Sequence, residues 1–121
     1  MRILVAEDEP AVRSLIEQVL ALEGFEVKAC ANGGEAMAAL HQFKPHLAVL
    51  DVMMPVSDGI GVLRAIREGD APDLPVILLT ARADDQSTWN GWRAGCNLYL
   101  TKPFDPEDLV SAIRQTIASL R

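Results

Sequence analysis

The strict alternation of short apolar runs with longer segments of helical periodicity is the feature that most limits how this chain can fold. Five runs are short and largely apolar: residues 2–6, 25–30, 46–51, 76–80 and 98–101. Each is followed by a segment whose apolar residues recur at the three- and four-residue spacing of one helix face. Apolar strands that alternate with helices are typical of a parallel sheet covered on both faces.

The predicted helices have residues suited to their ends. Pro10 opens the first helix, where its missing N–H costs nothing, and Gly24 ends it. A fourth helix includes Trp89 and Trp92, and the last helix has Pro106 at its first position. The pattern predicts an α/β, flavodoxin-like fold: a doubly wound five-stranded parallel sheet in the order 2-1-3-4-5, with five helices.

Length, charge and cysteine content exclude several classes of protein. The 121 residues fit a single domain, predicted to span 1–121 with no output domain. A net charge of -6 argues against direct binding to nucleic acid, which depends on Lys and Arg. No run approaches the roughly 20 apolar residues of a membrane span, and the first apolar run is too short for a signal peptide. Cys30 and Cys96 show no disulfide framework, which favours a cytoplasmic chain.

Four of the five apolar runs end on, or directly before, acidic, basic or hydroxyl-bearing residues, which are unexpected beside buried strands. Glu7 and Asp8 follow the first run, Asp51 and Thr80 end the third and fourth, and Lys102 follows the fifth. The carboxyl ends of parallel strands lie at one edge of the sheet, and the first and third strands are neighbours in the predicted order. We therefore expect Glu7, Asp8 and Asp51 to lie close together.

Three neighbouring carboxylates repel one another, and a divalent cation relieves that repulsion. Ligand sets made of oxygen atoms favour Mg²⁺ or Ca²⁺ over zinc. Lys102 would add a compact cation and Thr80 a hydroxyl group. A carboxylate flanked by a metal, a lysine and a hydroxyl suits phosphoryl transfer onto that carboxylate, because the reaction needs mainly positioning and charge neutralisation.

Four segments together resemble the response regulator receiver domain: EDEP, LDVMMPVSDG, LLTA and LYLTKPF. They occur in order and at family spacing, and the resemblance spans the whole chain. It implies a two-component signalling domain that accepts a phosphoryl group from a sensor histidine kinase or phosphotransfer protein. Phosphorylation would then change the binding of an output domain or effector. The resemblance implies no separate enzymatic activity, although the domain would promote its own phosphorylation and dephosphorylation.

The resemblance assigns the acceptor and the metal ligands. Asp51 corresponds to the phosphorylated aspartate. Glu7 and Asp8 correspond to the acidic pair that binds Mg²⁺, with Asp8 the more direct ligand and Glu7 acting mainly through water. Met53 corresponds to the residue whose backbone carbonyl completes the metal shell. Met53 and Arg82 would also border the path of the hydrolysing water, so Met53→Asn is expected to alter the lifetime of the phosphoryl group.

The resemblance also assigns the residues that respond to the phosphoryl group. Thr80 corresponds to the hydroxyl that moves to bind a phosphoryl oxygen, and Lys102 to the lysine that contacts the same group. The peptide bond between Lys102 and Pro103 is expected to be cis. Tyr99 corresponds to the aromatic residue that turns inward when Thr80 moves, and Ala81 to the small residue beside the acceptor.

Two departures from the family pattern concern partners. Asn97 and Leu98 stand where many winged-helix transcription regulators carry two aspartates that support a shared dimer surface. This difference argues against that mode for a phosphorylation-dependent dimer. Trp89 and Trp92 are large for their helix. One is expected in the core, and whether the other is a core residue or a partner contact stays open.

Other functions fit the sequence less well. A haloacid-dehalogenase-type phosphatase and a Toprim-type nuclease both need an acid two residues after the strand-end aspartate, where this chain has Met53. The acidic loop after the first strand does not suit flavin binding, and no P-loop or GxGxxG occurs. The remaining alternative is a receiver-like binding module that signals by contact and is not phosphorylated.

Overall fold

The computed structural model describes residues 1–54, 58–81, 92 and 94–120. Within these residues, one parallel sheet contains five strands: β1 (Arg2–Ala6), β2 (Glu26–Cys30), β3 (Leu47–Asp51), β4 (Val76–Thr80) and β5 (Leu98–Thr101). The strand order is β2-β1-β3-β4-β5, as predicted. The predicted second and third strands begin one residue earlier than the observed ones.

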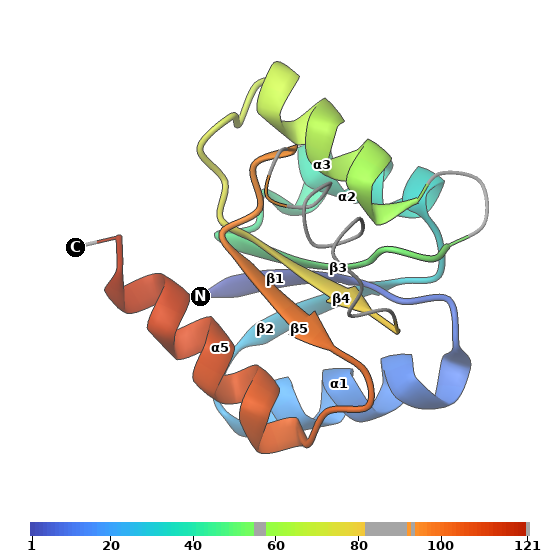
Figure 1. Ribbon diagram of the computed structural model, residues 1–121, viewed down its shortest axis with the longest axis vertical. Coiled ribbons are helices and arrows are strands. Elements are labelled where there is room, and N and C mark those ends of the chain that lie inside the picture. The colour runs from blue at the N-terminus through green and yellow to red at the C-terminus, as the bar shows by residue number, and fades with distance from the viewer. Residues whose placement is uncertain (55–57, 82–91, 93, 121) are drawn as a thin grey trace.

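Helices cover both faces of the sheet (Figure 1). The described residues form four helices: α1 (Pro10–Leu22), α2 (Gly33–Phe43), α3 (Gly59–Glu68) and α5 (Pro106–Ala118). Helices α1 and α5 lie on one face of the sheet, and α2 and α3 lie on the other. The fourth predicted helix falls mainly on residues 82–91 and 93, including Trp89, which lie outside the described residues. Trp92 and Ala94 are helical.

The two faces of each strand belong to two separate apolar layers. Ile3 and Val5 of β1 pack in the layer that includes residues of α1 and α5, whereas Leu4 and Ala6 pack in the layer that includes residues of α2 and α3. Successive side chains of a strand point to opposite faces. Fully burying one aliphatic side chain contributes about 1.5–3 kcal/mol. A register shift of one residue would exchange the two layers, so burial fixes the register.

Side-chain caps set where two helices begin after the carboxyl ends of strands. Asn32 Oδ1 accepts a hydrogen bond from the Glu35 backbone N at 2.9 Å, at the start of α2. Asp58 Oδ1 accepts one from the Gly61 backbone N at 2.7 Å, at the start of α3. Each cap satisfies an amide that the first helical turn leaves without a partner. The helix starts are thereby held near the edge of the sheet where the polar strand ends meet.

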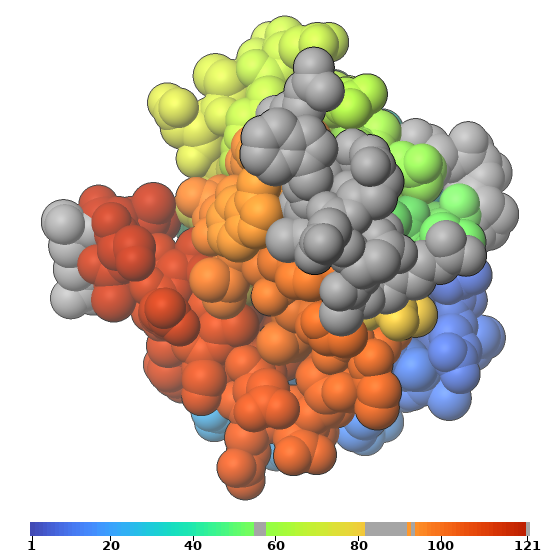
Figure 2. All heavy atoms as spheres, viewed as in Figure 1, coloured from blue at the N-terminus to red at the C-terminus, as the bar shows by residue number. Residues whose placement is uncertain are grey.

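Strand β5 is one edge of the sheet, and all four of its residues are half-buried. In the space-filling view, the segment coloured orange, which contains β5 and the residues after it, occupies the middle of this face of the molecule (Figure 2). None of the described helices has both the length and the apolar character needed to cross a membrane.

Candidate functional site

Buried polar side chains gather at the carboxyl edge of the sheet. Four polar or charged side chains are buried within the described part of the chain, and three of them lie at this edge: Glu7, Asp51 and Thr80. Glu7 is 0% exposed and Asp51 is 3% exposed. Burying a carboxylate is unfavourable unless it gains partners. An edge that buries two of them is therefore expected to supply those partners.

Lys102 supplies the positive charge. Its Nζ forms ion pairs with Glu7 Oε1 and with Asp51 Oδ2, the latter at 3.2 Å. Lys102 follows the last residue of β5, and its backbone N donates to the Thr80 carbonyl at 2.7 Å. One ammonium group therefore bridges the ends of β1 and β3 from the far side of β4. The peptide bond between Lys102 and Pro103 is cis, as predicted.

The Asp51 carboxylate is held through both of its oxygens. Oδ1 accepts a hydrogen bond from the Met53 backbone N at 3.1 Å, while Oδ2 pairs with Lys102. The backbone around Asp51 is fixed as well, because the Gly59 N donates to the Val52 carbonyl at 3.1 Å. A Cβ atom on Gly59 would lie 2.3 Å from the Asp51 carbonyl oxygen. Glycine is therefore required for α3 to begin this close to the end of β3.

Burial and the neighbouring charges shift the proton affinities of the buried pair. Burial is the largest effect on Glu7, and together with the neighbouring Asp51 it raises the Glu7 pKa to about 7, although Lys102 opposes the rise. Burial alone would lower the pKa of Lys102. Its bond to Glu7 and the charge of Asp51 outweigh that effect and raise the Lys102 pKa. The ammonium therefore stays charged, and Glu7 holds a proton more readily than an exposed glutamate.

The three acids are placed as a cation site requires. Glu7, Asp8 and Asp51 each offer a carboxylate oxygen, and these atoms lie within 4.8 Å of one another. Asp8 is exposed whereas the other two are buried, so solvent reaches the cluster from the Asp8 side. A set made of oxygen donors fits Mg²⁺ or Ca²⁺ and does not suit a thiophilic metal. The residues present therefore fit the predicted magnesium ion.

The two predicted switch residues share one face of the sheet. Thr80 ends β4, and Tyr99 of β5 is paired with Leu78, two residues before Thr80. Side chains two residues apart on a strand point to the same face, and so do directly paired residues of neighbouring strands. Thr80 and Tyr99 therefore both face the layer that contains Leu78, on the side of α2 and α3. Thr80 is buried and Tyr99 is half-buried.

The structure brings together most of the residues that the sequence singled out: Glu7, Asp8, Asp51, Met53, Thr80 and Lys102 lie at one edge. Ala81 follows Thr80 there and is exposed, whereas Arg82 lies outside the described residues. The Met53 side chain is 60% exposed. Two contacts of Glu7 were not predicted from the sequence: the ion pair of its carboxylate with Lys102, and the hydrogen bond that Arg13 Nη1 donates to its backbone carbonyl at 3.0 Å.

Asn97 has a structural role that its sequence position did not suggest. Its Oδ1 accepts hydrogen bonds from the Val76 backbone N at 2.9 Å and from Arg67 Nη2 at 3.0 Å. Leu98 packs against the apolar layer on the side of α1 and α5. The two residues that stand where many winged-helix regulators carry aspartates therefore both make contacts within this domain.

Comparison with known proteins agrees with this geometry. Residues 3–114 match the family model described as the response regulator receiver domain. The chain is 41% identical over 113 residues to the probable transcriptional regulator ycf27 of Galdieria sulphuraria, covering 93% of this chain and 44% of that protein. It is 39% identical over 114 residues to the transcriptional regulatory protein TrcR of Mycobacterium tuberculosis, covering 94% of this chain and 44% of that protein. The chain thus spans less than half the length of these relatives.

A solved structure is similar over nearly its whole length. The receiver domain of a sensor histidine kinase from Pseudomonas aeruginosa has 32% sequence identity and a TM-score of 0.88, with 97% of each chain covered. That structure is described as having a magnesium ion coordinated in its active-site cleft.

Proposed function

Because the chain belongs to the response regulator receiver domain family of two-component signalling, we propose that Asp51 is its phospho-acceptor and that phosphorylation changes its partner binding. The observation that carries the proposal is the placement of Asp51. Its carboxylate belongs to the cluster of three acids, and both of its oxygens are fixed by Lys102 and by the Met53 backbone N. A nucleophile held in one orientation loses little entropy on reaction.

The proposed reaction transfers a phosphoryl group from a phosphohistidine to Asp51. A carboxylate oxygen of Asp51 forms a bond to phosphorus, the bond from phosphorus to the histidine nitrogen breaks, and that nitrogen keeps the electron pair. Lys102, now 3.2 Å from Asp51 Oδ2, remains beside the new acyl phosphate and neutralises part of its charge. Thr80 at the end of β4 supplies a hydroxyl for another phosphoryl oxygen.

Glu7, Asp8, Asp51 and the Met53 backbone carbonyl would hold Mg²⁺. When bound, the ion supplies positive charge that offsets repulsion between the acids and the incoming phosphoryl oxygens. The exposed Asp8 is the natural direct ligand, because the Glu7 carboxylate is already paired with Lys102. The magnesium ion in the P. aeruginosa domain supports this assignment.

The proposed response follows from the shared face of Thr80 and Tyr99. Movement of the Thr80 hydroxyl toward the phosphoryl group vacates space on that face, and the Tyr99 ring turns inward to fill it. The exposed surface around β5 and α5 then changes its affinity for a partner. The domain would act in the cytoplasm, with a sensor histidine kinase or phosphotransfer protein as donor. An output domain, an effector or a second phosphorylated copy would be the partner.

The acceptor is tested by intact mass measurement after incubation with acetyl phosphate, with Mg²⁺ or with EDTA. Wild type and the control Asp73→Asn should each gain one phosphoryl group that depends on Mg²⁺. Asp73 is an exposed aspartate before β4, remote from the carboxyl edge. Asp51→Asn should gain none. Equal incorporation by Asp51→Asn and wild type would refute the assignment.

The alternative is a binding module that is not phosphorylated. It would be favoured if wild type gained no phosphoryl group from acetyl phosphate or from phosphorylated kinases, and if beryllium fluoride produced no change in the amide spectrum.

In a phosphorylated domain, Met53→Asn should change the rate of phosphoryl loss, because Met53 borders Asp51 and is exposed.

A further inference from the structure

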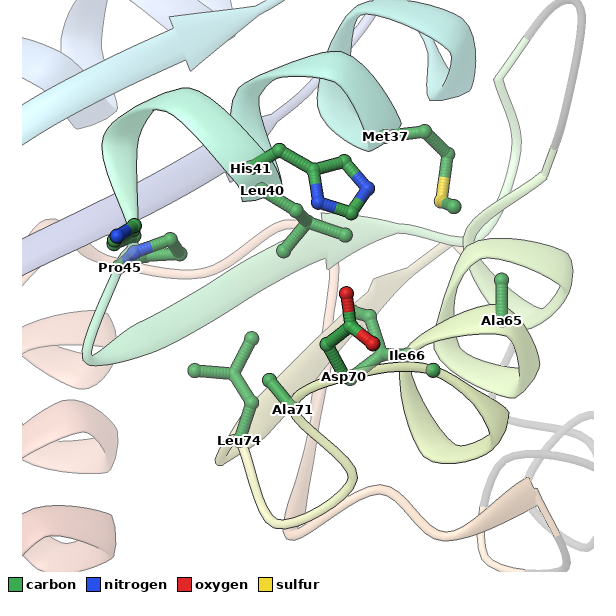
Figure 3. Close-up of a pocket in the computed structure, with 11 residues that line it drawn as sticks. Met37, Leu40, His41, Pro45, Ala65, Ile66, Asp70, Ala71 and Leu74 are labelled. Atoms are coloured by element: carbon green, nitrogen blue, oxygen red, sulfur yellow. The ribbon is translucent and has the colours of Figure 1, made fainter.

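A cavity of about 400 Å³ lies between the C-terminal parts of α2 and α3 and the segment that links α3 to β4 (Figure 3). Helix α2 ends at Phe43, just before β3 begins, and the linking segment leads into the start of β4. The cavity is therefore at the amino edge of the sheet, opposite the three acids. Its volume falls within the range of about 300–1,000 Å³ that is usual for small-molecule pockets.

Small side chains leave this space open, and an arginine holds its wall in place. Ala65, Gly69 and Ala71 line the cavity from α3 and the linking segment. The linking segment is anchored from behind, because Arg67 Nη1 donates to the Pro72 carbonyl at 3.0 Å and to the Leu74 carbonyl at 2.6 Å. These two hydrogen bonds hold the linking segment against α3.

The floor is apolar and the opening is polar. Met37 and Leu40 line the cavity from α2, and Ile66 and Leu74 line it from the opposite side. Asp70 and His41 are both exposed and line the same cavity. In Figure 3 the Asp70 carboxylate and the His41 ring point toward the space between α2 and α3.

The charges around the cavity favour a ligand with a single positive charge. The C-terminal end of α3 borders it, and helix C-termini carry partial negative charge. At the C-terminus of α2 the Phe43 and Lys44 carbonyls already accept hydrogen bonds from Arg2 Nε, at 2.9 and 3.0 Å. Asp70 adds a full negative charge, and the chain as a whole has a net charge of -6. Lys44 also lines the cavity and repels cations, so a single positive charge on the ligand is favoured beside Asp70 and not beside Lys44.

We propose that this cavity binds a small arylalkylammonium, that is, an aromatic ring joined by a short alkyl chain to one protonated amine. The ring packs on Met37, Leu40, Ile66 and Leu74, where the Met37 thioether makes favourable contacts with aromatic rings. The ammonium group lies at the opening. It donates to the Asp70 carboxylate and to a ring nitrogen of His41.

The test uses three probes with the same indole and ethylene skeleton: tryptamine is cationic, tryptophol is neutral and indole-3-propionate is anionic. Amide chemical shifts of the ¹⁵N-labelled protein are followed during titration with each probe. Tryptamine should shift the amides of residues 37–44 and 65–74, with a dissociation constant of about 1 mM, as ordinary ligand efficiency gives for this size. Tryptophol should bind several-fold more weakly, and indole-3-propionate more weakly still.

Matched variants separate the charge from the cavity. Asp70→Asn should weaken tryptamine binding about fivefold, the effect expected for a partly exposed ion pair, without changing tryptophol binding. Asp73→Asn, an exposed aspartate of the same segment that does not line the cavity, should leave tryptamine binding unchanged. Ala65→Leu should fill the space and abolish binding of all three probes. Ala71→Leu serves the same purpose if Ala65→Leu melts early.

Two results would overturn the proposal. One is the absence of shifts at residues 37–44 and 65–74 with every probe up to about 5 mM. The other is equal affinity for all three probes together with no effect of Asp70→Asn. Asp51→Asn should bind tryptamine as wild type does, so the outcome is independent of the proposed acceptor.

Discussion

Arg67 of α3 connects the segment that follows this helix with the residues that precede β5, about 30 positions later in the sequence, so its loss should destabilise the domain. Its Nε and Nη2 donate to the Gly95 carbonyl at 3.1 and 2.7 Å, and Nη2 also reaches Asn97 Oδ1 at 3.0 Å. Its Nη1 donates to the Pro72 and Leu74 carbonyls. Arg67→Met keeps an apolar stem of similar length and removes every donor. We predict that it lowers the free energy of unfolding.

The size of this loss depends on which of the four oxygen acceptors can form a hydrogen bond to water once the arginine is removed. A hydrogen bond from a charged donor contributes about 1.5–3 kcal/mol. Leu74 is buried and Gly95 is half-buried, so their carbonyls are the hardest to satisfy otherwise, whereas Pro72 and Asn97 are exposed. Counting two such bonds at the low end gives a loss of about 3 kcal/mol. At roughly 3–5 °C per kcal/mol for a domain of this size, Tm should fall by about 9–15 °C.

Thermal and urea unfolding, followed by circular dichroism, measure this loss. Arg64→Met is the matched control, because Arg64 lies one turn earlier on α3 and is exposed. It should change the free energy of unfolding by less than about 0.5 kcal/mol. Arg67→Lys should fall between wild type and Arg67→Met, since an ammonium cannot reproduce the forked geometry. An Arg67→Met protein as stable as Arg64→Met would refute the reasoning.

Three further perturbations address the site and the core. Gly59→Ala places a Cβ atom 2.3 Å from the Asp51 carbonyl oxygen and should cost about 1–3 kcal/mol in urea unfolding; Gly61→Ala, in an exposed helical position, should instead stabilise. Lys102→Met removes the cation within 3.2 Å of Asp51 and should tighten Mg²⁺ binding at least about tenfold, seen as a larger Mg²⁺-dependent rise in Tm; an unchanged Mg²⁺ response would contradict this. Burial raises the pKa of Cys96 to about 11. Because the thiolate is the reacting form, the rate of Cys96 alkylation by iodoacetamide should rise about tenfold per pH unit between about pH 8 and 10. A rate that stops rising near pH 9 would show that Cys96 has an ordinary thiol pKa.

Most of the fold could be predicted because few topologies satisfy the sequence pattern. Buried strands alternating with helices require crossovers of one hand, and polar strand ends identify the edge where the site lies. The errors are at boundaries: the second and third strands begin at Glu26 and Leu47, one residue later than predicted. The residue at which a strand begins is decided by local hydrogen bonding, which the apolar periodicity of the sequence does not reveal.

The site was predictable as a set of residues and not as a set of contacts. Topology alone places Glu7, Asp8 and Asp51 together. That Lys102 pairs with Glu7 as well as with Asp51 depends on how far β5 extends and how the sheet twists. The close approach of Gly59 to Asp51 depends on how the intervening loop returns. The cavity beside Asp70 has no sequence motif, because it arises from small residues on separate elements.

Asp51 ends the middle strand of the sheet, whereas Tyr99 belongs to an edge strand and Lys102 follows it. A middle strand opens only when two ladders of hydrogen bonds break, and an edge strand when one does. Amide hydrogen exchange should therefore be slower in β3 than in the two edge strands, β2 and β5. Under the proposed function, substitutions along β5 would alter which partner is recognised without changing the chemistry at Asp51, so one phosphorylation reaction would suffice for different outputs.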